Sequence, residues 1–129
     1  MKTAYVAMAT DVLHSGHINI INHAVMYGEV IVGVLTDEAI ATYKRVPFLD
    51  TQERMRIVES IKNVKRVVVQ KSLDYTEILR ELKPDYVLHG DDWRTGHLQV
   101  IRERVIDVLH EWDGELIEVP YTRYLSEDR

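Results

Sequence analysis

The chain has 129 residues, and its 21 acidic and 16 basic side chains give it a formal charge of −5. This length fits one domain with one core, and the absence of cysteine excludes disulfides, thiolate metal sites and thiol catalysis. The acidic excess argues against a non-specific nucleic-acid binder, and the sequence shows neither a signal-peptide pattern nor an apolar run that could cross a bilayer. We therefore expect a cytoplasmic protein that binds neither nucleic acid nor a membrane.

Apolar runs of strand length alternate with segments of helical periodicity, which is the pattern of a parallel sheet covered by helices on both faces. The predicted strands are residues 3–9, 30–35, 64–69, 86–88 and 115–119. The predicted helices are residues 15–27, 37–41, 50–61, 73–82 and about 98–112. The expected fold is therefore α/β, a doubly wound, Rossmann-like sheet of five parallel strands in the order 3-2-1-4-5.

Local signals predict where two of these helices end or begin. Gly28 follows the first helical pattern and is a candidate C-cap. Asp50, with Glu53 three residues later, resembles a capping pair and predicts a helix start. That helix would turn an apolar face to the core, formed by Met55, Val58 and Ile61.

Doubly wound sheets bind ligands at the carboxyl ends of their strands, where the strand order switches, so the residues after each strand are the candidates. His14 and His17 follow the first strand at the start of a helix, with Gly16 beside the second. Unpaired N–H groups at a helix start attract anions, a glycine permits close approach, and both imidazoles can donate hydrogen bonds. This spacing favours an anion site. The alternative is that Ser15 caps the helix and the histidines are ordinary, partly exposed residues.

Two further clusters follow the fourth and the second strand. The fourth strand leads into His89 and the sequence GDDW at 90–93, whose carboxylates could accept from a base, a ribose or a substrate amine, or hold a divalent cation through water. The alternative is an Asp-rich turn with Trp93 folded over the core. After the second strand come Lys44 and, in the first turn of the next helix, Arg54. A cation there opposes the helix dipole, which suits a residue aimed at an anionic substrate, although a solvated surface charge is the alternative.

Several nucleotide-binding and catalytic motifs are absent from the sequence. Without GxxxxGK[ST] it is not a P-loop NTPase, and without GxGxxG a dinucleotide oxidoreductase is disfavoured. It also lacks the GxSxG elbow of serine hydrolases. A flavodoxin-like receiver would need an Asp closing the third strand, which here runs into Gln70 and Lys71.

The sequence HSGH at 14–17 matches the HxGH signature of the nucleotidyltransferase superfamily, and together with GDDW at 90–93 it resembles the small cytidylyltransferases, including glycerol-3-phosphate cytidylyltransferase. Residues 83–93 and 120–122 are similar to the cytidylyltransferase domains associated with phosphoenolpyruvate mutase in phosphonate biosynthesis. The resemblance extends from the first strand to Pro120. It implies transfer of CMP from CTP to a small phosphonate or phosphate, with hydroxyalkyl- or aminoethylphosphonate favoured, and release of pyrophosphate.

The resemblance also implies roles for individual residues and partners. The implied catalytic residues are His14, His17 and Lys44. The implied nucleotide-binding residues are Ala9, Thr10, Asp11, Gly16, His89, Gly90, Asp91, Trp93, Tyr121, Thr122 and Ser126. The implied acceptor-binding residues are Lys44, Arg54 and Asp37. No residue is assigned as a metal ligand, because Mg²⁺ would be bound mainly through the nucleotide phosphates. We also expect a homodimer, and one domain over residues 1–129 that forms the amino-terminal part of a longer polypeptide fused to a mutase.

One segment departs from the family pattern. The family closes with an RTxGIS[ST][ST]-like segment, but here the matching residues 121–129 carry Tyr124 in place of glycine and Glu127 and Asp128 in place of hydroxyl residues. Either the domain is cut from a longer polypeptide or the terminal phosphate contacts are made differently. Three alternatives therefore stay open: glycerol-3-phosphate cytidylyltransferase, an adenylyltransferase that uses ATP, and a catalytically weak nucleotide-binding domain.

Overall fold

The computed structural model describes residues 1–10, 12–43, 45–94 and 96–120. Its five parallel strands form one sheet in the order β3-β2-β1-β4-β5, which confirms the predicted fold and strand order. The strands are β1 (Thr3–Met8), β2 (Glu29–Leu35), β3 (Val64–Gln70), β4 (Tyr86–Gly90) and β5 (Glu115–Val119). The helices are α1 (Ser15–Val25), α2 (Asp37–Ala41), α3 (Thr51–Glu59), α4 (Thr76–Leu82) and α5 (Gln99–Leu109). Three short 3-10 turns are η1 (Asp91–Arg94), η2 (Gly96–Leu98) and η3 (His110–Trp112).

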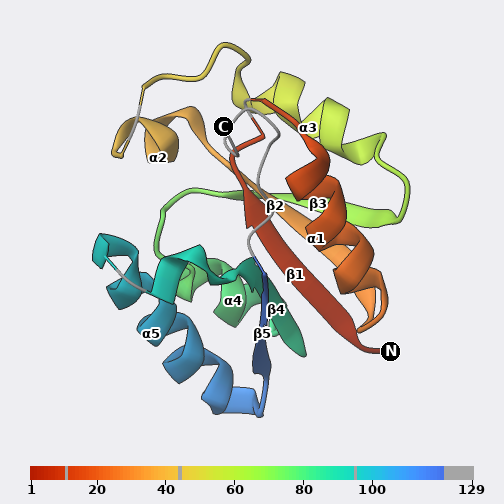
Figure 1. The fold of residues 1–129 in the computed structure, drawn as a ribbon, viewed down its shortest axis with the longest axis vertical. Coiled ribbons are helices and arrows are strands. Elements are labelled where there is room, and N and C mark those ends of the chain that lie inside the picture. The colour runs from red at the N-terminus through yellow and green to blue at the C-terminus, as the bar shows by residue number, and fades with distance from the viewer. Residues whose placement is uncertain (11, 44, 95, 121–129) are drawn as a thin grey trace.

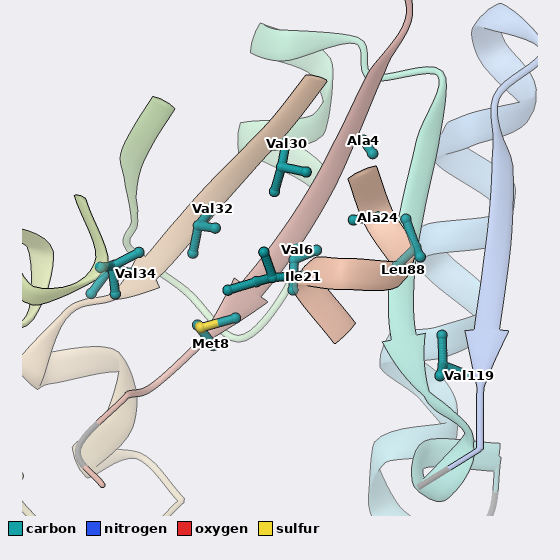
Figure 2. Close-up of a cluster of buried hydrophobic side chains, with 11 residues drawn as sticks. Ala4, Val6, Met8, Ile21, Ala24, Val30, Val32, Val34, Leu88 and Val119 are labelled. Atoms are coloured by element: carbon teal, nitrogen blue, oxygen red, sulfur yellow. The ribbon is translucent and has the colours of Figure 1, made fainter. Parts of the chain in front are cut away.

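Helices cover both faces of the sheet, with α1 and α3 on one side and α4 and α5 on the other (Figure 1). The strands build both cores by alternation, because successive side chains point to opposite faces. On β1, Ala4, Val6 and Met8 belong to the cluster under α1 and α3, whereas Tyr5 belongs to the cluster under α4 and α5. Figure 2 shows the first cluster, in which Ile21 of α1 lies among the strand side chains.

The structure confirms one of the two predicted helix signals and corrects the other. Asp50 is the N-cap of α3 and its carboxylate accepts from the Glu53 N–H at 2.9 Å. Within α3, Val58 is buried in the first core, with Met55 and the following Ile61 packed against it, as predicted. Gly28 is not a C-cap, since Met26 ends α1. A Cβ at Gly28 would lie 2.6 Å from the Lys2 carbonyl oxygen, so the glycine permits close approach of two backbones.

Strands β1 and β4, which are neighbours in the sheet, separate toward their carboxyl ends. β1 and β2 pair along their length, from Thr3 with Glu29 to Met8 with Val34. β1 and β4 pair only at Ala4 with Tyr86 and at Tyr5 with Val87. Because the strand order reverses between these two strands, their divergence opens a crevice at the place where such folds bind ligands.

The observed elements differ from the predicted ones mainly at their ends. β4 continues through His89 to Gly90, two residues further than predicted, and α4 begins at Thr76, three residues later. In the described part of the chain, no helix has the length and apolar character required to cross a membrane.

Candidate active site

A cavity of about 370 Å³ lies at the carboxyl ends of β1 and β4, where the two strands diverge. Strand residues form its floor, the start of α1 forms one side, and residues after β3 and on α5 form the other. Its main polar groups are His14, His17, Gln70, His89 and Asp92. The cavity also takes in Ala9, Gly16, Gly90 and Trp93, so it brings together residues that the sequence assigned to one site.

The two histidines of the HxGH motif build the start of α1. His14 is the N-cap residue, and its Nδ1 accepts from the Gly16 N–H at 3.0 Å. His17 Nδ1 accepts in turn from the His14 N–H at 3.1 Å, and the ring centroids are 4.1 Å apart. The alternative in which Ser15 caps the helix is therefore wrong. Because both Nδ1 atoms accept, each ring in its neutral form carries its proton on Nε2.

Thr10 sits in a strained turn directly after β1. Its φ is 56°, in the left-handed region that β-branched residues avoid, and it is buried. Its hydroxyl donates to the Ala9 carbonyl at 2.6 Å, which accepts from Arg54 as well at 2.7 Å. These bonds fix the turn that leads from β1 toward the histidines.

Arg54 requires a correction, because it is neither a surface charge nor available to a substrate. Its side chain is 0% exposed. Each of the five N–H groups of a guanidinium can donate once, and Arg54 donates to five acceptors. They are the carbonyls of Leu49 (2.9 Å), Ala9 (2.7 Å) and Leu35 (2.7 Å), the Asp37 carboxylate (2.6 Å) and the Thr51 hydroxyl (3.3 Å). Arg54 therefore ties together the ends of β1 and β2.

Asp37 is a partly exposed member of the same network. Besides the Arg54 ion pair, its carboxylate accepts from the Thr51 hydroxyl at 3.2 Å, and its own N–H donates to that hydroxyl at 3.1 Å. Neither Asp37 nor Arg54 is among the described residues that line the cavity. The burial of Arg54 argues against its predicted direct contact with the acceptor, whereas the predicted role of Asp37, which is 33% exposed, stays a prediction.

Three residues of the GDDW segment, Gly90, Asp92 and Trp93, line the cavity. Trp93 is buried, and its indole donates to Glu118 at 2.9 Å. His89 stacks on this indole at 3.6 Å and 4°, and its Nδ1 lies 2.7 Å from the Gly90 carbonyl. Burial lowers the pKa of His89, so the ring is neutral near pH 7. Asp92 is among the described residues that line the cavity, and Asp91 is not.

Glu118 supports the wall of the cavity through Trp93, and sequence reasoning missed it. Its carboxylate on β5 is 8% exposed and accepts from both Nε and Nη2 of Arg102, at 2.9 and 3.0 Å. It also accepts from Arg94 at 3.1 Å and from the Trp93 indole. The hydrogen bond from Arg102 is the main cause that lowers the pKa of Glu118 to about 2. The sequence does carry a signal for this residue. Glu118 lies two positions after Leu116 in a strand, so both side chains point to the same, inward face of the sheet.

Tyr5 and Gln70 form a second network that was not predicted. The Tyr5 ring crosses β2 over Gly33, where a Cβ would lie 1.7 Å from the phenol oxygen. The buried phenol donates to Gln70 Oε1 at 2.6 Å, and Gln70 Nε2 donates to the Ser72 carbonyl at 2.8 Å. Burial raises the pKa of Tyr5 well above its usual value, so the phenol remains a donor. The network fixes the chain after β3 along the cavity.

Five of the predicted site residues lie outside the described part of the chain. They are Asp11, Lys44, Tyr121, Thr122 and Ser126. Among the described residues there is no group of three His, Asp or Glu side chains that could hold a metal ion. Asp92 is the one carboxylate among the described residues of the cavity wall.

Part of this chain is similar in sequence to known proteins. The FAD synthase of Methanopyrus kandleri is 34% identical over 96 residues, which are 71% of this chain and 64% of that protein. The ethanolamine-phosphate cytidylyltransferase of Arabidopsis thaliana is 35% identical over 88 residues, which are 64% of this chain and 21% of that protein. The chain thus spans less than two thirds of the length of both relatives.

Solved structures show the same fold at lower identity. A lipopolysaccharide core biosynthesis protein from Thermoplasma volcanium has a TM-score of 0.77 at 21% identity, covering 96% of this chain and 98% of that chain. Pantothenate synthetase from Thermus thermophilus has a TM-score of 0.68 at 15% identity, covering 96% of this chain and 57% of that chain. A family model described as cytidylyltransferase-like matches residues 10–121. Because that match covers most of the chain, including both motifs of the cavity, the chain belongs to the cytidylyltransferase-like family of nucleotidyltransferases.

Proposed function

We propose that the chain transfers CMP from CTP to an oxygen of a small phosphate or phosphonate and releases pyrophosphate. The observation that carries this proposal is the pair of imidazoles at the start of α1. His14 and His17 line the same cavity as Gly16 at the start of a helix, and their Nδ1 bonds hold both rings in place there. A helix start with two neutral donors suits the phosphates of a nucleotide.

In the proposed reaction, the acceptor oxyanion attacks the α-phosphorus as a new P–O bond forms. The bond from that phosphorus to the bridging oxygen breaks, and the electron pair leaves with pyrophosphate. The oxyanion is already deprotonated near pH 7, so the protein needs no strong base and works by positioning and by stabilising charge. His14 and His17 would donate to the phosphate oxygens, and Lys44 would bridge nucleotide and acceptor. A bound Mg²⁺ would supply positive charge to the leaving pyrophosphate.

The structure changes how the remaining residues enter this proposal. Arg54 and Asp37 would act by holding the ends of β1 and β2, since their bonds are made within the protein. Trp93 would act as a wall beside the nucleoside, because its indole N–H is bonded to Glu118 and its ring is stacked on His89. The homodimer and the fusion to a phosphoenolpyruvate mutase stay predictions of the family resemblance, and the cytoplasmic location stays a prediction of the sequence signals.

The relatives favour two different nucleotides. The name of one relative specifies cytidylyl transfer, which supports CTP. Another relative is named for the synthesis of FAD, which contains an adenine nucleotide, so ATP is the second candidate. Calorimetric titration with each nucleotide in the presence of Mg²⁺ tests this choice, and we expect tighter binding of CTP. Tighter binding of ATP would replace the proposal by adenylyl transfer.

Release of pyrophosphate tests the reaction itself. The assay contains CTP, Mg²⁺ and one acceptor at a time: 2-aminoethylphosphonate, 2-hydroxyethylphosphonate, ethanolamine phosphate or glycerol-3-phosphate. We expect turnover with at least one of them. Binding of CTP without turnover on any acceptor would instead support the catalytically weak nucleotide-binding domain.

A further inference from the structure

His89 lies near the end of β4, on the side of the cavity that the proposed function gives to the nucleoside. It lines the cavity, and its ring stacks on the Trp93 indole at 3.6 Å and 4°. In the sheet His89 pairs with Glu118, whose carboxylate accepts from the indole N–H at 2.9 Å. The wall behind the imidazole therefore fixes its position. Because the indole N–H is already bonded to Glu118, a hydrogen bond from this stacked pair to a ligand has to come from the imidazole.

Two oxygen atoms determine the tautomer of His89. Its Nδ1 lies 2.7 Å from the Gly90 carbonyl oxygen and 3.8 Å from Asp92 Oδ1. A carbonyl oxygen accepts and cannot donate, so Nδ1 carries the proton and donates to Gly90. Burial lowers the pKa of His89, so the ring is neutral near pH 7 and its Nε2 has no proton. Nε2 is therefore a hydrogen-bond acceptor and not a donor.

This acceptor is open to the cavity. Within the described part of the chain, His89 Nε2 has no hydrogen-bond partner. The same part of the chain contains no buried side-chain nitrogen or oxygen without a partner, so Nε2 is not buried. The His89 side chain is 23% exposed, and the open space that it lines is the cavity. A bare acceptor in a partly buried wall favours a ligand group that donates a hydrogen bond.

Pyrimidine bases differ in the group that such an acceptor would meet. Cytosine carries a 4-amino group, which donates, whereas uracil carries a 4-oxo group, which accepts. An oxo group opposite Nε2 would bring two acceptors together and leave both without a donor. The tautomer of His89 thus distinguishes the two bases by one hydrogen bond.

We propose that His89 Nε2 accepts a hydrogen bond from the 4-amino group of cytosine and thereby selects CTP over UTP. This inference rests on the proposed function and identifies a residue that would recognise its base. Adenine carries an amino group as well, so the choice between CTP and ATP depends on the titration described above and not on His89.

The test compares three nucleotides that differ at position 4 of the pyrimidine ring. They are CTP, UTP and the pyrimidin-2-one analogue of CTP, in which hydrogen replaces the 4-amino group. The readout is the Kd from calorimetry with Mg²⁺, which needs no acceptor substrate. We expect the wild-type chain to bind the analogue about tenfold more weakly than CTP, the scale of a hydrogen bond whose loss leaves an acceptor unsatisfied. UTP should bind more weakly still, because its O4 opposes Nε2.

His89→Phe keeps a flat ring for the stack on Trp93 and removes the acceptor. In this variant CTP and the analogue should bind within about twofold of each other, whereas a merely structural loss would weaken both and keep their ratio. His110→Phe is the matched control, because His110 is exposed on η3 and is not among the described lining residues. It should keep the wild-type ratio. Far-ultraviolet circular dichroism confirms that each variant is folded.

Several outcomes would overturn the inference. Equal binding of CTP and the analogue by the wild-type chain would do so without any variant, and so would a His89→Phe variant that keeps the wild-type ratio. Loss of the ratio in Asp92→Asn but not in His89→Phe would assign the amino group to that carboxylate instead. Failure of the wild-type chain to bind CTP would overturn the proposed function and this inference together. Binding of CTP without discrimination against UTP and the analogue would overturn this inference alone.

Discussion

Replacing Glu118 by Gln removes the charge at the centre of the Trp93, Arg94 and Arg102 cluster while keeping the shape of the side chain. The pKa of Glu118 is lowered from 4.5 to about 2, which corresponds to about 3 kcal/mol of stabilisation at neutral pH. Arg94 is 57% exposed, so solvent screens its share. We therefore expect Glu118→Gln to lower the free energy of unfolding at pH 7 by about 2–3 kcal/mol.

The sign of the pH dependence follows from the direction of this pKa. Because the folded value is below the unfolded value of 4.5, the stabilisation is complete above pH 4.5 and is lost as the pH falls toward about 2. Urea unfolding at several pH values should show this loss in the wild-type chain, and a flatter dependence over the same range in Glu118→Gln. Glu115→Gln on the same strand is the control, since Glu115 is exposed and should shift stability by less than about 0.5 kcal/mol. Equal pH slopes in the wild-type chain and Glu118→Gln would refute the reasoning.

Three further substitutions test the site and its frame. His17→Ala removes one preorganised donor and should lower turnover roughly 10²–10³-fold in the pyrophosphate assay, whereas near-normal turnover would dismiss the assigned role. Arg54→Lys keeps the charge but cannot serve five acceptors, so urea unfolding should show a loss of about 3 kcal/mol or more, and wild-type stability would contradict the network. Gly33→Ala places a methyl group 1.7 Å from the Tyr5 oxygen and should cost about 2–3 kcal/mol by the same measurement; an unchanged midpoint would show that the ring can move.

The fold was predictable because its signals are local and repeat along the chain. Apolar runs at β1 and β2 and the helical spacing between them predict two parallel strands joined by a right-handed helical crossover. The ends of β4 were less predictable, because His89 and Gly90 carry no apolar signal and are held in the strand by pairing with Glu118 and Val119. Strand pairing of this kind depends on residues that are distant in the sequence.

The candidate site was predictable where its residues are adjacent in sequence. The spacing of His14 and His17 is that of a helix cap and the position three residues later, so the motif and the geometry agree. Arg54 was interpreted wrongly because its acceptors come from three segments that only the fold brings together, at Ala9, Leu35 and Leu49. In a sequence, an arginine is a plausible ligand for anions. Only the structure shows that acceptors within the protein already take all the hydrogen bonds that its guanidinium can donate.

The divergence of β1 from β4 has a consequence for how a bound molecule is recognised. Beyond Tyr5 and Val87 the facing edges of these strands are not joined by the ladder, so a molecule seated between them meets main-chain amides and carbonyls. Such groups are present whatever the side chain, which makes this part of the contact surface independent of residue type. Substitution of a few surrounding side chains can then change the ligand specificity while the main chain of the crevice keeps its geometry.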